Sequence, residues 1–126
     1  QPDFRADGRE ILANGEVGQW TSIVNINASN GAVLRSQTAF TDDYNPFWSP
    51  DGTRFTYDSF HHGLPRYGLM LYTQGLTGGN PQPEVTVRYE GRQIHGHSPV
   101  WMQDDHIAFT GCDYWYGGTD GSRCGI

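Results

Sequence analysis

Histidine pairs are the first feature of this 126-residue chain that could carry chemistry. His61-His62 and His95-x-His97 have spacings compatible with a metal site, because imidazole nitrogens are common ligands of transition metals. Two such pairs bind one ion only if their loops converge, which the spacing does not show. Exposed loop histidines are the more common case, so we predict no metal site and no cofactor.

Aspartates form two adjacent pairs, which could act as an acid and a base or as ligands for a hard cation. Asp42-Asp43 and Asp104-Asp105 both flank predicted strands, where Asp usually bonds to turn backbone. We therefore interpret both pairs as structural. The chain has no Gly-x-Ser-x-Gly elbow, no His-Glu-x-x-His helix motif and no Gly-rich phosphate loop, so we predict no catalytic residue and no enzyme activity.

A repeat must position these residues. It occurs as PDFRADGREILANG (2–15), PFWSPDGTRFTYDSF (46–60) and PVWMQDDHIAFTG (99–111). In the second copy, Ser49-Pro50-Asp51-Gly52 supplies Pro for the second turn position, Asp to bond its own backbone and Gly for positive φ. The first copy keeps Asp7 and Gly8. The third copy has lost both Pro and Gly, so we expect its turn to be the least regular.

Aromatic and β-branched residues flank each turn at the period-2 spacing of half-buried strands. The copies begin 46 − 2 = 44 and 99 − 46 = 53 residues apart, and four-stranded propeller blades repeat every ~40–50 residues. Further strands are predicted at 22–26, 32–36, 67–72 and 84–89. The predicted fold class is all-β, with propeller blades of four antiparallel strands. About two and a half blades are expected, as units 1–43, 44–97 and 98–126.

The stretch PFWSPDGTRFTY resembles the Trp-Ser-Pro-Asp-Gly signature of the TolB-type β-propeller repeat, closely in the second unit and partly in the other two. This resemblance implies blades whose first strand lines a central channel. It implies no reaction, because such propellers serve as binding platforms and scaffolds. Two alternatives stay open: the propeller domain of a hydrolase or peptidase, and a polysaccharide lyase that uses His-bound metal.

Strands of a blade alternate in direction, so turns after strands one and three lie on one face and turns after strands two and four on the other. The second face is predicted to collect His61, His62, His95, His97, Tyr114, Trp115 and Tyr116. Functional residues concentrate on loops held by a rigid scaffold. We therefore predict that this face binds a protein or carbohydrate partner.

Large aromatics recur at a fixed place in the repeat, where Trp48 follows Pro46 and Trp101 follows Pro99. We expect them to fill the interfaces between blades. Closed propellers have about four to eight blades, and an incomplete ring leaves apolar blade faces in water. We therefore expect further blades, from the rest of a longer chain or from other copies.

Cys112 and Cys124 are the only cysteines. The repeat places them at the end of strand two and the start of strand three, which are neighbours, so we predict a disulfide between them. Two buried thiols or a metal-bound pair are the alternatives, but a Gly-rich loop is a poor place to bury thiols. A disulfide implies an oxidising compartment: the periplasm, the cell surface or the extracellular space.

Charge and composition limit the remaining possibilities. The formal net charge is −6, with eight Lys and Arg and no basic run, so we expect no nucleic-acid partner. With 17 Gly and 7 Pro, no apolar stretch has membrane-spanning length. Asn27-Ala28-Ser29 fits both a glycosylation sequon and a polar turn, and the sequence leaves both readings open.

Overall fold

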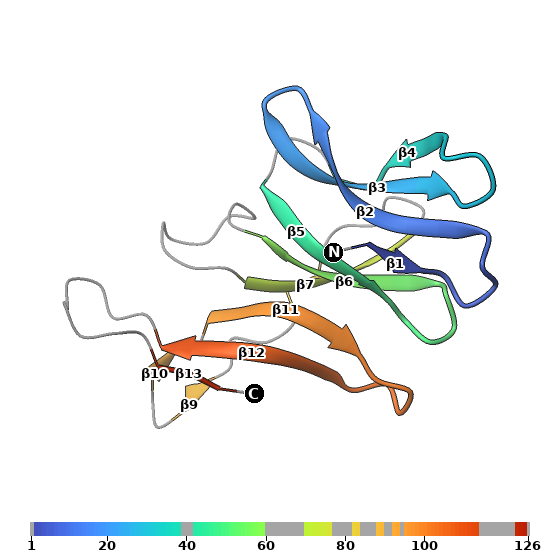
Figure 1. Cartoon of the computed structure of the whole chain (residues 1–126). Coiled ribbons are helices and arrows are strands. Elements are labelled where there is room, and N and C mark those ends of the chain that lie inside the picture. The colour runs from blue at the N-terminus through green and yellow to red at the C-terminus, as the bar shows by residue number, and fades with distance from the viewer. Residues whose placement is uncertain are drawn as a thin grey trace.

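The chain folds into successive antiparallel sheets (Figure 1). The structure, a computed structural model, describes residues 2–38, 42–59, 70–76, 82–83, 88–89, 92–93, 95–113 and 123–125. The first sheet, here called blade one, contains β1 (Asp3–Phe4), β2 (Glu10–Val17), β3 (Trp20–Asn27) and β4 (Val33–Ser36). Blade two contains β5 (Asp43–Trp48), β6 (Arg54–Ser59), β7 (Met70–Gly75) and β8 (Gln82–Pro83).

Blade three has three described strands: β11 (His95–Trp101), β12 (Ile107–Asp113) and β13 (Arg123–Gly125). In all three blades the strands pair in chain order, each antiparallel to the next. The predicted fold class is therefore confirmed: the chain is all-β and made of propeller blades, and no described residue lies in a helix. Among the described residues, accordingly, no helix could cross a membrane.

The fourth strand of blade two differs from the prediction. It is β8, where Pro83 pairs with Tyr72, rather than 84–89. Proline is tolerated there because β8 is an edge strand. Arg88–Tyr89 (β9) pairs instead with Arg92–Gln93 (β10), across a connection of the two-residue length that favours hairpins. Residues 84–87 lie outside the described part of the chain.

The three turns of the repeat share one hydrogen-bond frame. Gly8 N–H donates to Arg5 O, Gly52 N–H to Ser49 O, and Asp105 N–H to Met102 O. The donor residue has positive φ each time: 70°, 67° and 67°. Asp105 thus adopts the left-handed conformation that glycine adopts in the other two turns.

Turn length distinguishes the third copy. The first two turns close with Arg5 N–H to Glu10 O and Ser49 N–H to Arg54 O, whereas the third closes with Met102 N–H to His106 O. The third turn is therefore one residue shorter. The third copy has therefore lost one residue of the turn but keeps the turn and its hydrogen bond from Asp105 N–H to Met102 O.

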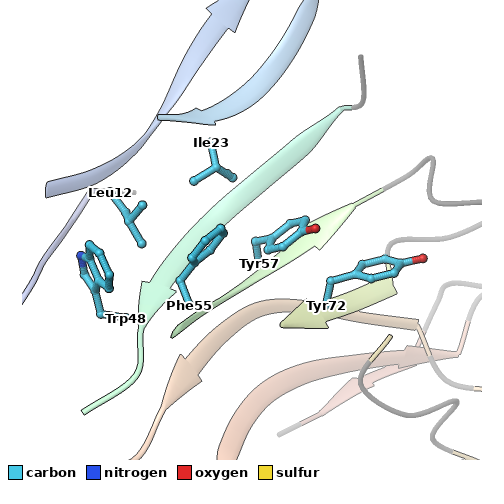
Figure 2. Close-up of a cluster of buried hydrophobic side chains, with 6 residues drawn as sticks. All are labelled: Leu12, Ile23, Trp48, Phe55, Tyr57 and Tyr72. Atoms are coloured by element: carbon cyan, nitrogen blue, oxygen red, sulfur yellow. The ribbon is translucent and has the colours of Figure 1, made fainter. Parts of the chain in front are cut away.

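The hydrophobic core lies between blades one and two (Figure 2). It consists of Leu12, Ile23, Trp48, Phe55, Tyr57 and Tyr72. Alternation along β6 explains its position, because Phe55 and Tyr57 point to one side of blade two while Thr56 and Asp58 point to the other. The aromatic side faces β2 and β3 of blade one, so the polar side is left for blade three.

Candidate functional site

The strand ends define two faces, which we call the loop face and the turn face. At the loop face, the register pairs Asp43 with Ser59, and Ser59 with Met70, in blade two. In blade three it pairs His95 with Cys112. The turn face carries the three repeat turns at 5–10, 49–54 and 102–106 (Figure 1). Both faces thus follow from antiparallel strands joined in chain order.

The predicted binding residues fall on the loop face wherever the structure describes them. His95 begins β11, and His97 lies two residues further along the same strand. The His97 side chain is half-buried, with its Nδ1 3.4 Å from Ser98 Oγ. The other predicted members lie outside the described residues: His61, His62, Tyr114, Trp115 and Tyr116.

Cys112 and Cys124 lie directly opposite each other across β12 and β13, as Cα partners in the antiparallel register. The same register pairs Asp113 with Arg123, which are the described residues on either side of the segment that contains Trp115. Opposite residues of antiparallel strands have Cβ atoms about 4.5–5.5 Å apart, which is near the spacing of a disulfide. The backbone arrangement is therefore compatible with the predicted bond.

Asp58 is a buried carboxylate close enough to His97 to interact with it electrostatically, and the sequence did not single it out. It lies near the loop-face end of β6, on the side of the strand that faces blade three, and its exposed fraction is 0%. Oδ2 accepts a hydrogen bond from Ser98 N–H at 2.9 Å, and another from Asn45 Nδ2 at 3.1 Å. One carboxylate therefore joins the inner strands of blades two and three.

Burial raises the pKa of Asp58, while the bonds from Ser98 and Asn45 and the nearby His97 act in the opposite direction. A charged carboxylate in this position is thus only partly compensated for its lost hydration. The polar alternation of Thr56 and Asp58 within an apolar strand is the one sequence signal that could have indicated it.

The two residues held by Asp58 occupy the same place in their repeats. Asn45 precedes Pro46 with φ of 50°, and Ser98 precedes Pro99 with φ of 52°. At both places the register of the inner strand shifts, as in a β-bulge. A proline disfavours helical conformations in the residue before it. The repeat therefore builds a bulge into each inner strand beside the loop face.

In the first aspartate pair, the structure shows a side-chain contact for Asp42 and a main-chain contact for Asp43. Asp42 Oδ1 accepts Thr21 N–H at 3.3 Å, and the backbone oxygen of Asp43 accepts Asn14 Nδ2 at 2.9 Å. Asp43 is fully buried. Burial raises the pKa of Tyr57 and of Tyr72, and the Asp43 carboxylate adds to this effect.

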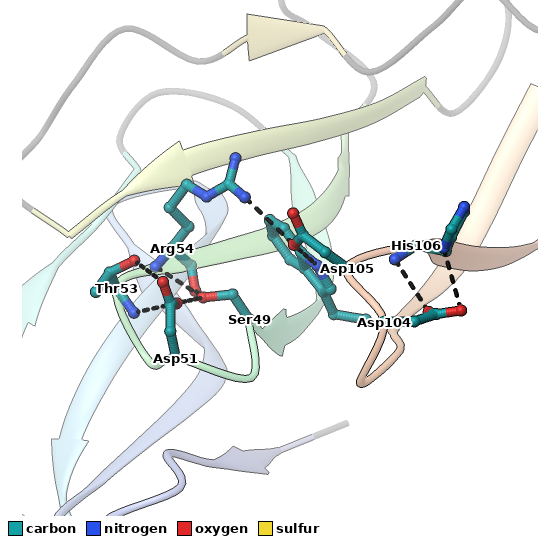
Figure 3. Close-up of polar contacts among 8 residues, drawn as sticks. Ser49, Asp51, Thr53, Arg54, Asp104, Asp105 and His106 are labelled. Atoms are coloured by element: carbon teal, nitrogen blue, oxygen red, sulfur yellow. Dashed lines mark hydrogen bonds and ion pairs between the residues drawn. The ribbon is translucent and has the colours of Figure 1, made fainter.

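At the turn face, the Asp51 carboxylate forms hydrogen bonds within its own turn (Figure 3). Its carboxylate accepts the Ser49 hydroxyl at 2.6 Å and Thr53 N–H at 3.0 Å. The Ser49 hydrogen bond is the main cause that lowers the pKa of Asp51 to about 2. Asp104 plays the same part in the third turn, accepting His106 N–H at 3.3 Å, which lowers its pKa.

A second cluster of the turn face links blades two and three. The Arg54 guanidinium lies 4.7 Å from the centroid of the Trp101 ring. Asp105 Oδ1 accepts Trp101 Nε1–H at 2.8 Å and lies 3.5 Å from Arg54 Nη2 (Figure 3). The contacts of Arg54 thus join blades two and three, while the Trp101–Asp105 hydrogen bond lies within blade three. Within the described ranges, no three His, Cys, Asp or Glu residues are grouped to hold a metal ion.

Comparison with known proteins identifies the fold. No protein-family model and no curated protein matches the sequence. Among solved structures, TolB from Acinetobacter baumannii is similar over 98% of this chain and 28% of its own, with a TM-score of 0.62 and 17% identity. A putative TolB from Agrobacterium tumefaciens is similar over 97% and 42%, with a TM-score of 0.70 and 16% identity.

The likeness to these TolB structures establishes a TolB-like propeller fold. It extends over almost all of this chain, so the arrangement of successive blades is shared rather than a single sheet. The chain spans less than half the length of either structure. Fold supports many unrelated functions, so function has to be argued from the faces described above.

Proposed function

We propose that this chain is a non-enzymatic binding or scaffold propeller, and part of a larger extracytoplasmic protein or assembly. Its TolB-type character is supported by the Trp48-to-Gly52 motif together with the TolB-like fold. The observation that carries the proposal is the shared loop face. The ends of β6 and β12 and the starts of β7, β11 and β13 lie there, and the longest loops leave from them.

The loop face has the properties expected of a binding platform. His97 stands on a strand fixed by the Asp58–Ser98 bond, rather than on a loop alone. The Tyr114-Trp115-Tyr116 segment belongs to the connection that begins and ends at paired strands. Aromatic side chains supply large contact area at low cost in conformational entropy. A protein or a carbohydrate partner is therefore the proposed ligand class.

A binding comparison between the two faces tests this proposal. The purified protein is immobilised and exposed to extracytoplasmic extract and to a panel of polysaccharides, and each retained partner is quantified. We expect His97→Ala and Trp115→Ala to reduce retention by about tenfold or more, as truncation at a hot spot does. Thr53→Ala, on the turn face, is the control. Equal or greater loss at Thr53 would contradict the proposal.

The enzymatic alternatives are tested on the same samples. Retained polysaccharide is analysed for chain cleavage, and the protein for bound metal. Binding without cleavage is the expected result. Cleavage that depends on a bound metal ion and is lost in His97→Ala would replace the proposal with a lyase.

The proposed compartment depends on the Cys112–Cys124 disulfide. Their direct pairing in the register supports this bond, which would close the loop that carries Trp115. We expect thiol titration of the unreduced, denatured protein to find no free thiol, and to find two after reduction. Two free thiols before reduction would remove both the disulfide and the compartment that it implies.

A further inference from the structure

Trp48 and Trp101 differ in what accepts the hydrogen of their indole N–H. Trp101 Nε1–H donates to Asp105 Oδ1 at 2.8 Å. Trp48 is only 3% exposed, and its Nε1 has no hydrogen-bond partner in the part of the chain that the structure describes. Buried Trp N–H groups usually find an acceptor, because an unsatisfied buried donor costs free energy. The junction between blades one and two therefore contains an indole N–H that lacks its acceptor.

The repeat shows which acceptor this junction lacks. Asp105 is the fourth residue after Trp101. Gly52 is likewise the fourth residue after Trp48. Both have φ of 67°, and each donates its N–H to close the same turn hydrogen bond. Glycine has no side chain, so the carboxylate of the third turn has no counterpart in the second.

The Asp105 carboxylate serves two donors at once. Its Oδ1 accepts the Trp101 indole N–H and lies 3.5 Å from Arg54 Nη2. The Arg54 guanidinium in turn lies 4.7 Å from the centroid of the Trp101 ring. The Asp105 side chain is 71% exposed, so a carboxylate in this place approaches the indole from the solvent at the turn face. An indole N–H, a guanidinium and one anion thus form a complete set.

Among the described residues, the first junction holds the two donors of this set without the anion. The Arg5 guanidinium lies 5.6 Å from the centroid of the Trp48 ring. Its ion pairs with Asp7 and Glu10 are long, at 3.7 and 3.5 Å, and use Nε and Nη1. A guanidinium has five N–H donors and no acceptor, so Arg5 cannot accept the indole hydrogen. An anion placed between Arg5 and Trp48 would satisfy the indole and add an ion pair.

The Arg5 side chain borders the place that this anion would take. A Cβ added to Gly52 would lie 3.0 Å from Arg5 Nε and 3.2 Å from Arg5 Cγ. The Arg5 side chain is 28% exposed, so a change of rotamer can turn it outward. Figure 2 shows the Trp48 nitrogen on the edge of the ring that faces away from Phe55. A group that enters from the turn face can therefore reach the indole without opening the apolar core.

We propose that Arg5 and the indole N–H of Trp48 form a subsite that binds a carboxylate group of a ligand. One carboxylate oxygen accepts the indole N–H, and the guanidinium pairs with the same group, as in the Asp105 cluster. Arginine matches the shape of a carboxylate, and hydrogen bonds to an anion are stronger than neutral ones. The carboxylate can belong to a free organic acid or to an acidic side chain of a peptide. The subsite lies on the turn face, so it is independent of the partner proposed for the loop face.

Proton–nitrogen NMR of the whole chain tests the subsite, because each indole N–H gives a resonance of its own. The Trp48 resonance is assigned by its loss in Trp48→Phe. Sodium acetate is added at pH 7, with sodium chloride in a parallel titration. We expect acetate to move the Trp48 resonance downfield until it saturates, because the N–H then donates to an anion. The Trp101 resonance should stay in place, since Asp105 already accepts that N–H. No movement with acetate, or the same movement with chloride, would overturn the proposal.

A capped aspartate, N-acetylaspartic acid amide, distinguishes the two sources of the carboxylate. It is titrated beside acetate, and both are expected to move the Trp48 resonance. Half-saturation at a lower concentration of acetate identifies a free organic acid as the ligand. Half-saturation at a lower concentration of the capped aspartate identifies an acidic side chain.

Gly52→Asp builds a carboxylate into the subsite, and Gly52→Ala is its control for the added Cβ at positive φ. Asp adopts this conformation more readily than most residues. We expect Gly52→Asp to shift the Trp48 resonance without acetate and to remove the response to acetate, while Gly52→Ala keeps the response. A response that Gly52→Asp leaves unchanged would contradict the proposal.

Arg5→Met tests the cation separately and leaves Gly52 in place. Methionine keeps an apolar stem without the charge, so about tenfold or more acetate should be needed for the same response of the Trp48 resonance. Arg9→Met removes a charge from the exposed first turn and is the control. It should change the titration little, because salt screens exposed charges. Equal weakening by both variants would show a general effect of charge and would overturn the proposal.

Discussion

The two junctions between blades contain different kinds of side chain. Between blades one and two, aromatic rings of Trp48, Phe55 and Tyr57 pack against Leu12 and Ile23. Between blades two and three, the corresponding space holds the Asp58 carboxylate, and Gly96 of β11 lies close to the neighbouring blade. The same β6 strand supplies both sides, so one alternating sequence presents Phe55 and Tyr57 to blade one (the apolar junction) and Thr56 and Asp58 to blade three (the polar junction).

This contrast indicates two ways to hold blades together. The apolar junction gains free energy from buried area, at ~25 cal/mol per Å². The polar junction gains less from area and more from directed hydrogen bonds and close backbone approach. It lies beside the proposed binding residues, since His97 is next to Ser98 in β11. The Asp58–Ser98 hydrogen bond of the second junction therefore fixes the backbone next to His97.

The largest expected effect comes from the apolar junction. Trp48→Ala should lower the free energy of unfolding by about 3–5 kcal/mol, because it removes a buried aromatic and leaves a cavity. Denaturant titration measures this loss. Phe4→Ala in the 126-residue chain is the matched control and should cost less than half as much, since Phe4 is largely exposed there. A nearly neutral Trp48→Ala would show that the junction is not a core.

Gly96 probes the close approach at the second junction. A Cβ at Gly96 would lie 2.8 Å from Leu71 Cγ and 3.0 Å from Phe109 Cδ2. Gly96→Ala should therefore cost about 1–3 kcal/mol through overpacking. Gly75→Ala is the control, because a Cβ there meets nothing within 4 Å. If thermal unfolding showed similar losses of stability for both variants, the loss at Gly96 would come from replacing glycine in a strand and not from contact between blades.

Much of this contrast could be predicted from the sequence, and the reasons are local. The Asp51-Gly52 turn and the aromatic alternation around it depend on neighbours within a few residues. The Asp58–Ser98 bond could not be predicted, because it joins residues 40 positions apart whose proximity depends on the packing of two blades. The fourth strand of blade two was predicted at 84–89, whereas β7 pairs with 82–83, because alternation alone does not tell which neighbour a strand pairs with.

The pH dependence of stability distinguishes Asp58 from Asp51. The pKa of Asp58 is raised in the folded state, so its favourable contribution is complete below the unfolded pKa, about 3.9. This contribution is lost as the pH rises through the folded pKa. Asp51, with a folded pKa of about 2, has the opposite sign. It contributes above the unfolded pKa, and this contribution is lost as the pH falls toward 2.

We therefore expect Asp58→Asn to gain stability relative to wild type as the pH rises from about 4 to 7. Asp51→Asn should lose stability relative to wild type as the pH rises from about 2 to 4, because that interval lies between the folded and unfolded pKa values of Asp51. Urea titrations at several pH values measure both differences, and referring each variant to wild type cancels the contribution of Asp3, whose pKa is also raised. Parallel curves for wild type and Asp58→Asn would mean that the carboxylate is not held in a partly compensated, buried state.

The smallest expected effect concerns a feature that both junctions share, an arginine over a tryptophan. Arg54 is about half-exposed and lies 4.7 Å from the Trp101 centroid, and Arg5 lies 5.6 Å from that of Trp48. Cation–π contacts at exposed sites contribute about 0.5–1 kcal/mol. Arg54→Met keeps the aliphatic stem and removes the charge, so it should cost about that much.

A double-mutant cycle with Trp101→Leu isolates the ring contact, because the two losses should add to more than the loss in the double variant. Asp105 requires its own control, since its carboxylate bonds Trp101 Nε1 and lies near Arg54. The cycle is therefore repeated in an Asp105→Asn background, which keeps a side chain able to adopt positive φ and to accept the indole N–H. Coupling that persists there belongs to the ring. Coupling that disappears belongs to the Arg54–Asp105 ion pair, and the two junctions would then share only the placement of their arginines and not the interaction.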